Sequence, residues 1–150
     1  MSGTINIPCC YALIRRGDKI LFVLRQNTGF MDGKYSLPAG HVEPGESFSQ
    51  GAAREALEEV GVTVLPQDLQ QVYAQHRYQN SESIRVDVFF EATKWSGEPV
   101  NAEPHKHAKI EWISVDDLSD AIMDYQLRAL QGILKGETYS EIGWTIDKIA

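Results

Sequence analysis

The chain is poor in the features that mark secreted, membrane-spanning and nucleic-acid-binding proteins. Its only cysteines in 150 residues are Cys9 and Cys10, and two adjacent cysteines provide neither a disulfide framework nor the ligand spacing of a zinc site. No apolar run reaches the length of a membrane-spanning helix. The N-terminus lacks the basic segment and apolar core of a signal peptide. We therefore expect a cytoplasmic protein with no membrane partner.

Positive charge is scarce as well. The chain has 14 lysines and arginines against 21 aspartates and glutamates, which gives a net charge of −7. Proteins that bind nucleic-acid polymers rely on clustered basic residues, so we expect no such polymer as a partner. A small nucleotide remains compatible with the sequence, because a bound cation locally reverses the sign of an acidic site.

Length and composition predict a single domain over residues 1–150. Hydrophobic residues make up 43% and charged residues 23% of the chain, as is ordinary for a globular protein. Strands mixed with helices indicate an α/β protein. Apolar patterns predict strands over 7–14, 19–24, 35–37, 70–78, 84–92 and 108–113, and helices over 48–60 and 115–135. Residues 137–150 show no clear period.

The first of these helices has a signal at each end. Ser47 and Gln50 form the pattern of a capping box, and Gly61 stands where a left-handed residue ends a helix. A spacing of 3.6 residues predicts one buried face, made of Phe48, Ala52, Ala53, Ala56, Leu57 and Val60.

Three glutamates lie on the edge next to that face. Glu55, Glu58 and Glu59 have the spacing i, i+3 and i+4, which places them together on a helix. Such a cluster is by itself compatible with a solvated acidic surface. Crowded carboxylates repel one another, however, and a divalent cation would neutralise them. Ligands that are all oxygen suit Mg²⁺ or Mn²⁺.

The segment from Gly40 to Val62 resembles the Nudix box, Gly-x5-Glu-x7-Arg-Glu-U-x-Glu-Glu-x-Gly-U, in which U is aliphatic. Ala56 and Val62 occupy the U positions, and Ala56 is smaller than usual. The resemblance covers roughly residues 5 to 135, and it implies the Nudix fold, a mixed β-sheet sandwiched between α-helices. The fixed positions are filled by Gly40, Glu46, Arg54, Glu55, Glu58, Glu59 and Gly61.

This resemblance implies an activity. Members of the family are Mg²⁺-dependent hydrolases, in which Mn²⁺ can substitute, that cleave the diphosphate linkage of a nucleoside diphosphate joined to a further group. We expect a normal or modified nucleoside triphosphate to be split into a monophosphate and pyrophosphate. A dinucleoside polyphosphate or a nucleotide sugar is an alternative substrate. A non-catalytic nucleotide-binding regulator is a third hypothesis, although such modules usually lose box glutamates. Relatives are often homodimers, but nothing in the sequence marks an interface.

The resemblance also suggests roles for the box residues. Glu58 and Glu59 are the first metal ligands to consider, and Glu55 is either a third ligand or the general base. The carbonyl of Gly40 is a further candidate ligand, because a glycine allows the backbone to approach a metal closely. Together with Arg54, these glutamates form the expected catalytic set.

Supporting residues are also implied. A bidentate fork from Arg54 would hold Glu46 or Glu55 in position, which makes Glu46 structural, as is Gly61. A further carboxylate from a distant loop would complete the metal site, with Glu103 as the candidate and Glu98 as its rival.

Substrate contacts are less constrained by the sequence. His105 and His107 have no matching ligand spacing, so we do not predict a histidine metal site. Aromatic residues such as Tyr11 and Phe30 could stack on a base, although burial in the core is their more ordinary role. Candidate phosphate or nucleotide contacts, each with a plain surface charge or core position as its alternative, are Arg25, Lys34, His41, Arg77 and Tyr78.

Overall fold

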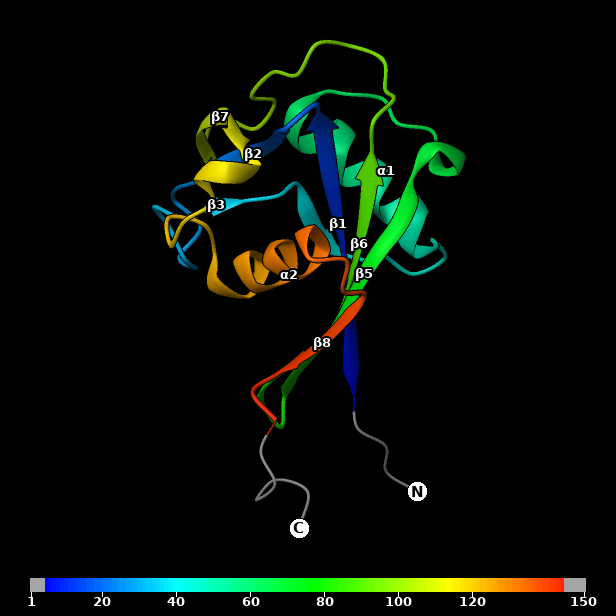
Figure 1. Cartoon of the computed structure of the whole chain (residues 1–150), viewed down its shortest axis with the longest axis vertical. Helices are drawn as coiled ribbons and strands as arrows, with labels where there is room; N and C mark the ends of the chain where they lie inside the picture. Colours follow the sequence, from blue (N-terminus) through cyan, green and yellow to red (C-terminus); the bar gives the residue numbers. More distant parts are fainter. Residues whose placement is uncertain (1–4, 145–150) are drawn as a thin grey trace.

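A computed structural model describes residues 5–144 of the chain (Figure 1). Two helices pack against strands that form one eight-stranded system. The strands are β1 (Asn6–Arg16), β2 (Lys19–Arg25), β3 (Tyr35–Ser36), β4 (Ala39–His41), β5 (Gln70–Asn80), β6 (Ser83–Ala92), β7 (His107–Ser114) and β8 (Tyr139–Ile142). The helices are α1 (Phe48–Val60) and α2 (Asp124–Leu134), with short 3-10 turns η1 (Pro66–Asp68) and η2 (Val115–Asp117).

The first strand is the centre of the sheet. Along most of its length β1 runs parallel to β6, and its other edge pairs antiparallel with β4. At its end β1 turns into β2, which pairs antiparallel with β3 and β7. On the far side, β5 lies antiparallel to β6 and parallel to β8. The sheet is therefore mixed, as the sequence predicts.

Both faces of β1 are buried, each under a different helix. Cys10, Ala12 and Ile14 belong to the core that contains Ala52 and Ala56 of α1. Side chains alternate along a strand, so the residues between them, such as Leu13, belong to a second core with Ala129 and Leu130 of α2. In Figure 1, α2 lies to the left of the long strands, whereas α1 passes behind β1 and β6. The predicted α/β layering, with the sheet between helices, is confirmed.

Helix α1 begins and ends where the sequence signals place its ends. Ser47 and Gln50 form a reciprocal capping box, and Gly61 ends the helix in the left-handed conformation with φ of 70°. The buried face differs in part from the prediction. Leu57 is 52% exposed, whereas Glu59 is only 6% exposed. A carboxylate therefore occupies a position on the side of the helix that faces the sheet.

The predicted helix over 115–135 is wrong in its first half. Only η2 forms at its start, and α2 does not begin until Asp124. The backbone between them is diverted to β3, because the N–H of Tyr35 bonds to the carbonyl of Ala121 and the N–H of Met123 bonds to the carbonyl of Tyr35. These two hydrogen bonds replace the helical ones that the local pattern favours.

Residues after α2 form a strand that the sequence analysis does not predict. β8 adds to the edge of β5, with Ala74 opposite Tyr139 and Arg77 opposite Ile142. The rest of the C-terminal segment, 145–150, lies outside the described residues. Within residues 5–144, no helix combines the length and apolar character needed to cross a membrane.

Candidate active site

The box residues come together because β4 runs directly beneath α1. Gly40 pairs with Cys10 of β1, which fixes its backbone next to the helix. A Cβ at this position would overlap the carboxylate of Glu55. Glycine is therefore required here for a steric reason, since it leaves room for a carboxylate beside the strand.

Arg54 holds several of the box carboxylates in place. Its Nε and Nη2 donate to the two oxygens of Glu46 at 3.0 and 2.7 Å, in a bidentate pair. Its Nη1 donates to Glu55 at 2.9 Å and to Glu58 at 3.3 Å. Hydrogen bonds from Arg54 hold the pKa of Glu46 below its usual value. The pairing of Arg54 with Glu46 and Glu55, which the sequence predicts, is confirmed.

The three glutamates of α1 differ sharply in their surroundings. The side chain of Glu58 is 50% exposed, whereas that of Glu55 is 13% exposed. Glu59 is buried, and its Oε2 accepts a hydrogen bond from the backbone N–H of Ala39 at 2.8 Å. Burial raises the pKa of Glu55, and burial beside Glu55 raises the pKa of Glu59 well above its usual range. The fold therefore keeps two carboxylates close together in a poorly solvated place.

A loop from across the cleft adds two more groups. Glu103 and His107 each offer a ligand atom within 4.8 Å of one from Glu59. His107 Nε2 lies 3.4 Å from Glu59 Oε1. Burial lowers the pKa of His107, which favours the neutral ring over an ion pair with Glu59. Glu98, the alternative loop carboxylate, lies instead beside Arg16 at 3.6 Å.

The group as a whole fits a divalent cation. Its donors are carboxylate oxygens and the imidazole of His107, and Arg25, Arg54 and Lys106 also line the cleft. Among residues 5–144, His107 Nδ1 is buried without a hydrogen-bond partner, so these residues do not use the full hydrogen-bonding capacity of the imidazole. The residues that would hold the cation are Gly40, Glu55, Glu58, Glu59, Glu103 and His107.

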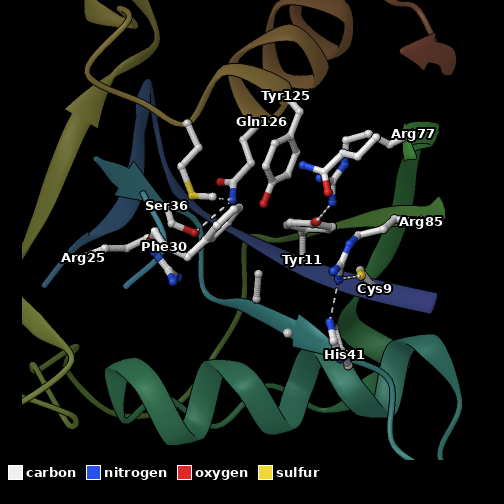
Figure 2. A pocket seen from close by; sticks show the side chains of 14 residues that line it. Cys9, Tyr11, Arg25, Phe30, Ser36, His41, Arg77, Arg85, Tyr125 and Gln126 are labelled. Carbon is white, nitrogen blue, oxygen red and sulfur yellow. Dashed lines mark hydrogen bonds between the residues drawn. The ribbon is translucent and has the colours of Figure 1, made fainter. Parts of the chain in front are cut away.

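A second pocket lies beside the carboxylates, with a volume of about 250 Å³ (Figure 2). Tyr125 and Gln126 of α2 form one wall, and Tyr11 of β1 lies opposite them. His41 also lines this pocket, where its Nε2 lies 2.7 Å from Arg85 Nη1. Burial and the charge of Arg85 lower the pKa of His41. The pocket thus combines aromatic rings with the imidazole of His41 and the guanidinium of Arg85.

A buried ion pair supports the floor of this pocket. Arg77 contacts Asp87 through Nε at 2.8 Å and Nη2 at 3.1 Å. The Tyr11 hydroxyl donates to the same carboxylate at 2.7 Å, and the guanidinium lies 3.6 Å from the centre of the Tyr125 ring. The charge of Arg77, which the sequence analysis assigns to phosphate, is thus already matched by Asp87.

The remaining substrate candidates lie in different places. Arg25 lines both the aromatic pocket and the carboxylate cleft. Lys34 lines neither of them and donates to the carbonyl of Asp120 at 2.5 Å. Tyr78 packs against Trp144 with ring centres 4.9 Å apart, beside the pocket rather than in it. The structure therefore brings Arg25 and His41 to the site and leaves Lys34 and Tyr78 outside it.

Sequence reasoning missed several residues of this site. Arg85, Tyr125 and Gln126 come from a strand and a helix that carry no motif, so no local signal marks them. The sequence analysis does not predict His107 as a ligand. Glu103 is only four residues away, but Glu59 is distant in sequence, and only the fold brings the three side chains together.

Comparison with known proteins gives the family. The NUDIX domain family matches residues 7–131. The chain is 34% identical over 111 residues to the NAD-capped RNA hydrolase NudC of Stutzerimonas stutzeri, covering 74% of this chain and 37% of that protein. It is 37% identical over 111 residues to NudC of Escherichia coli O1:K1, covering 74% of this chain and 40% of that protein. The chain thus spans about two fifths of the length of these curated relatives.

Solved structures agree with this match. The MutT NUDIX hydrolase from Burkholderia pseudomallei superimposes with a TM-score of 0.76 at 26% identity, covering 85% of this chain and 97% of that one. The MutT protein from Methanosarcina mazei Go1 gives a TM-score of 0.72 at 26% identity, covering 90% and 97%. From its sequence match, its fold and its complete box, this chain belongs to the Nudix hydrolase family.

Proposed function

We propose that this chain is a Mg²⁺-dependent pyrophosphohydrolase, for which Mn²⁺ can substitute, and that its substrate is a nucleoside triphosphate, normal or modified. Water would attack one phosphorus of the triphosphate and release a nucleoside monophosphate and pyrophosphate. We further propose that residues 1–150 act as one domain. The cytoplasmic location and the homodimer stay predictions.

The observation that carries this proposal is the shared wall between the two cavities. Arg25 and Ala39 line both the aromatic pocket and the carboxylate cleft. A nucleoside held in the aromatic pocket would therefore extend its phosphates past Arg25 toward Glu58. A diphosphate linkage is long enough to cross such a boundary and carries the charge that a cation cluster binds.

The chain's own residues would prepare the site in three ways. Arg54 restrains Glu55 and neutralises part of the acidic cluster. The N–H of Ala39 fixes one oxygen of Glu59 and leaves the other facing the cleft. Glu58 is exposed, so it can turn to the cleft without breaking a core contact. When bound, the divalent cation supplies charge neutralisation for the phosphates and acidifies the attacking water.

A second candidate substrate follows from the curated relatives, which are named as NAD-capped RNA hydrolases. An NAD cap also contains a nucleoside joined to a diphosphate, so it presents the same bond to the same carboxylates. This candidate includes an RNA polymer, which the charge balance argues against. The chain covers only about two fifths of these relatives, so their substrate passes to it as a hypothesis to test.

Two assays with Mg²⁺ test the proposal: pyrophosphate release for the triphosphates, and phosphate release by an added phosphatase from the phosphomonoesters that the other compounds would yield. The panel contains normal and oxidised nucleoside triphosphates, dinucleoside polyphosphates, ADP-ribose, nucleotide sugars, NADH and NAD-capped RNA. Glu58→Gln is the test variant, and Glu98→Gln is the matched control, because that glutamate is exposed and lies away from the cleft.

We expect turnover of a triphosphate that falls by about a hundredfold or more in Glu58→Gln and is unchanged in Glu98→Gln. Turnover confined to NADH or capped RNA would transfer the assignment to the second substrate class. No turnover of any compound, or full activity in Glu58→Gln, would remove the proposed role of the box and favour a nucleotide-binding module.

A further inference from the structure

His107 stands apart from the other residues of the carboxylate cleft because it brings a nitrogen donor. It is the first residue of β7, and its exposed fraction is only 3%. Its Nε2 faces Glu59 Oε1 at 3.4 Å, and a ligand atom of Glu103 lies within 4.8 Å of both. This places a buried histidine beside two carboxylates that come from separate segments, which is the arrangement of a metal site.

Packing fixes the backbone of this histidine. Its carbonyl accepts a hydrogen bond from Asn101 Nδ2 at 2.7 Å, and its N–H bonds to the carbonyl of Glu103 at 3.0 Å. On the other side, His107 pairs with Arg25 at the end of β2. The ring therefore has little freedom to leave the cleft.

The ring is held firmly but its hydrogen-bonding capacity is not used up. Nδ1 is buried and has no hydrogen-bond partner among residues 5–144. The nitrogen that faces the carboxylates is the other one, Nε2, 3.4 Å from Glu59 Oε1, and a proton on Nδ1 leaves the lone pair of Nε2 free to bind a cation. A purely structural histidine would be expected to spend both ring nitrogens on the protein.

The spacing suits one cation. Two ligands on opposite sides of a cation with bonds of about 2.1 Å lie about 4.2 Å apart. The ligand atoms of Glu59, Glu103 and His107 lie within 4.8 Å of one another, so small side-chain rotations are enough to close the site. Carboxylate and imidazole together form a mixed oxygen and nitrogen ligand set.

We propose that His107 is a nitrogen ligand to the cation held by Glu59 and Glu103, and that it gives this site a preference for Mn²⁺ and similar transition metals over Mg²⁺. The inference rests on the proposed function, because it takes for granted that the cleft binds a divalent cation. Mg²⁺ strongly prefers oxygen, whereas Mn²⁺ binds a nitrogen ligand better than Mg²⁺ does, and later transition metals such as Co²⁺ bind it better still. The histidine would therefore bias metal choice without changing the reaction.

Pulsed EPR of the Mn²⁺-loaded protein tests the ligand directly. A nitrogen bonded to Mn²⁺ gives a ¹⁴N coupling, and labelling the histidines with ¹⁵N replaces it by a ¹⁵N coupling. The test variant is His107→Gln, which keeps an oxygen donor of similar reach. The control is His105→Gln, because His105 lies in the same loop but is not part of the ligand cluster.

We expect the histidine coupling in the wild-type protein and in His105→Gln, and its loss in His107→Gln. Calorimetric titration with each metal should show that the preference for Mn²⁺ over Mg²⁺ falls by about tenfold or more in His107→Gln and stays unchanged in His105→Gln.

The outcomes separate this inference from the proposed function. If Mn²⁺ binds but the wild-type spectrum lacks a histidine coupling, His107 is not a ligand and the cation site itself stands. If Mn²⁺ does not bind at all, the metal dependence of the proposed function is overturned as well. A labelled wild-type spectrum without a histidine coupling overturns the proposal even if His107→Gln fails to fold.

Discussion

The buried pair between Arg77 and Asp87 gives the sharpest stability prediction. Asp87 is 0% exposed and accepts hydrogen bonds from Tyr11, from Gln75 and twice from Arg77. Asp87→Asn keeps the shape of the side chain but removes its charge. Arg77, which is 5% exposed, would then carry an uncompensated charge in the core.

Removing one partner of a buried ion pair costs about 3–5 kcal/mol. We therefore expect Asp87→Asn to lower the free energy of unfolding by about that amount. In a protein of this size, each kcal/mol shifts the melting temperature by about 2–4 °C, so the expected fall is about 6–20 °C. Urea unfolding followed by circular dichroism and by tryptophan fluorescence would measure it, with an unchanged m-value as evidence that the same unfolding is compared.

A double variant isolates the role of charge. Arg77→Met with Asp87→Leu removes both charges together, so it should be less destabilised than Asp87→Asn alone, by about 1 kcal/mol or more. Tyr11 loses its acceptor in the double variant, so full recovery is not expected. A loss below about 1 kcal/mol in Asp87→Asn, or a double variant worse than the single one, would refute the reasoning.

Three further predictions concern α1 and the residues around it. Gly61→Ala should lower stability by about 1 kcal/mol in urea unfolding, because φ is 70° and the left-handed region disfavours a Cβ; an unchanged midpoint would contradict this. Burial raises the pKa of Cys10 to about 12, so roughly one thiol in ten thousand is ionised at pH 8. A thiol reagent should therefore label Cys10 only in denaturant. Mass spectrometry of rapidly quenched samples would check this. Burial raises the pKa of Glu59, so some stability of the wild-type fold is lost as the pH rises through that pKa and the carboxylate becomes charged. In the presence of EDTA, Glu59→Gln should therefore be more stable than wild type by about 1 kcal/mol at pH 8. Thermal melts at low pH should show no such gain. A variant that is less stable than wild type at pH 8 would show that the charge of Glu59 is not a burden on the fold.

Features encoded by neighbouring residues were predictable from the sequence. The capping box at Ser47, the left-handed end at Gly61 and the edge of glutamates all depend on contacts within a few residues. The box also marks Gly40, but for another reason: the sequence analysis expects its carbonyl to approach a metal, whereas in the structure a Cβ at this position would overlap the carboxylate of Glu55. These are the parts of the fold and site in which local spacing and final geometry coincide.

Features that depend on distant pairing were not predictable. The pattern after Ser114 favours a continuous helix, but Tyr35 takes the backbone of Ala121 and Met123 for β-type hydrogen bonds. Arg77 looks like a free cation in sequence, and only the register of β5 on β6 places it near Asp87. The same holds for His107, because only the folded chain places this first residue of β7 next to Glu59 of α1.

The balance of charge around Arg54 has a consequence for the order of binding. Five glutamates line the carboxylate cleft, whereas its arginines and lysines within the described residues are Arg25, Arg54 and Lys106. An incoming nucleotide is itself an anion, so the empty cleft repels it at long range, and more strongly at low ionic strength. A nucleotide that arrives already complexed with its cation meets an attractive field instead. The acidic cleft therefore acts as an entrance filter, which admits the metal complex of a nucleotide ahead of the free anion.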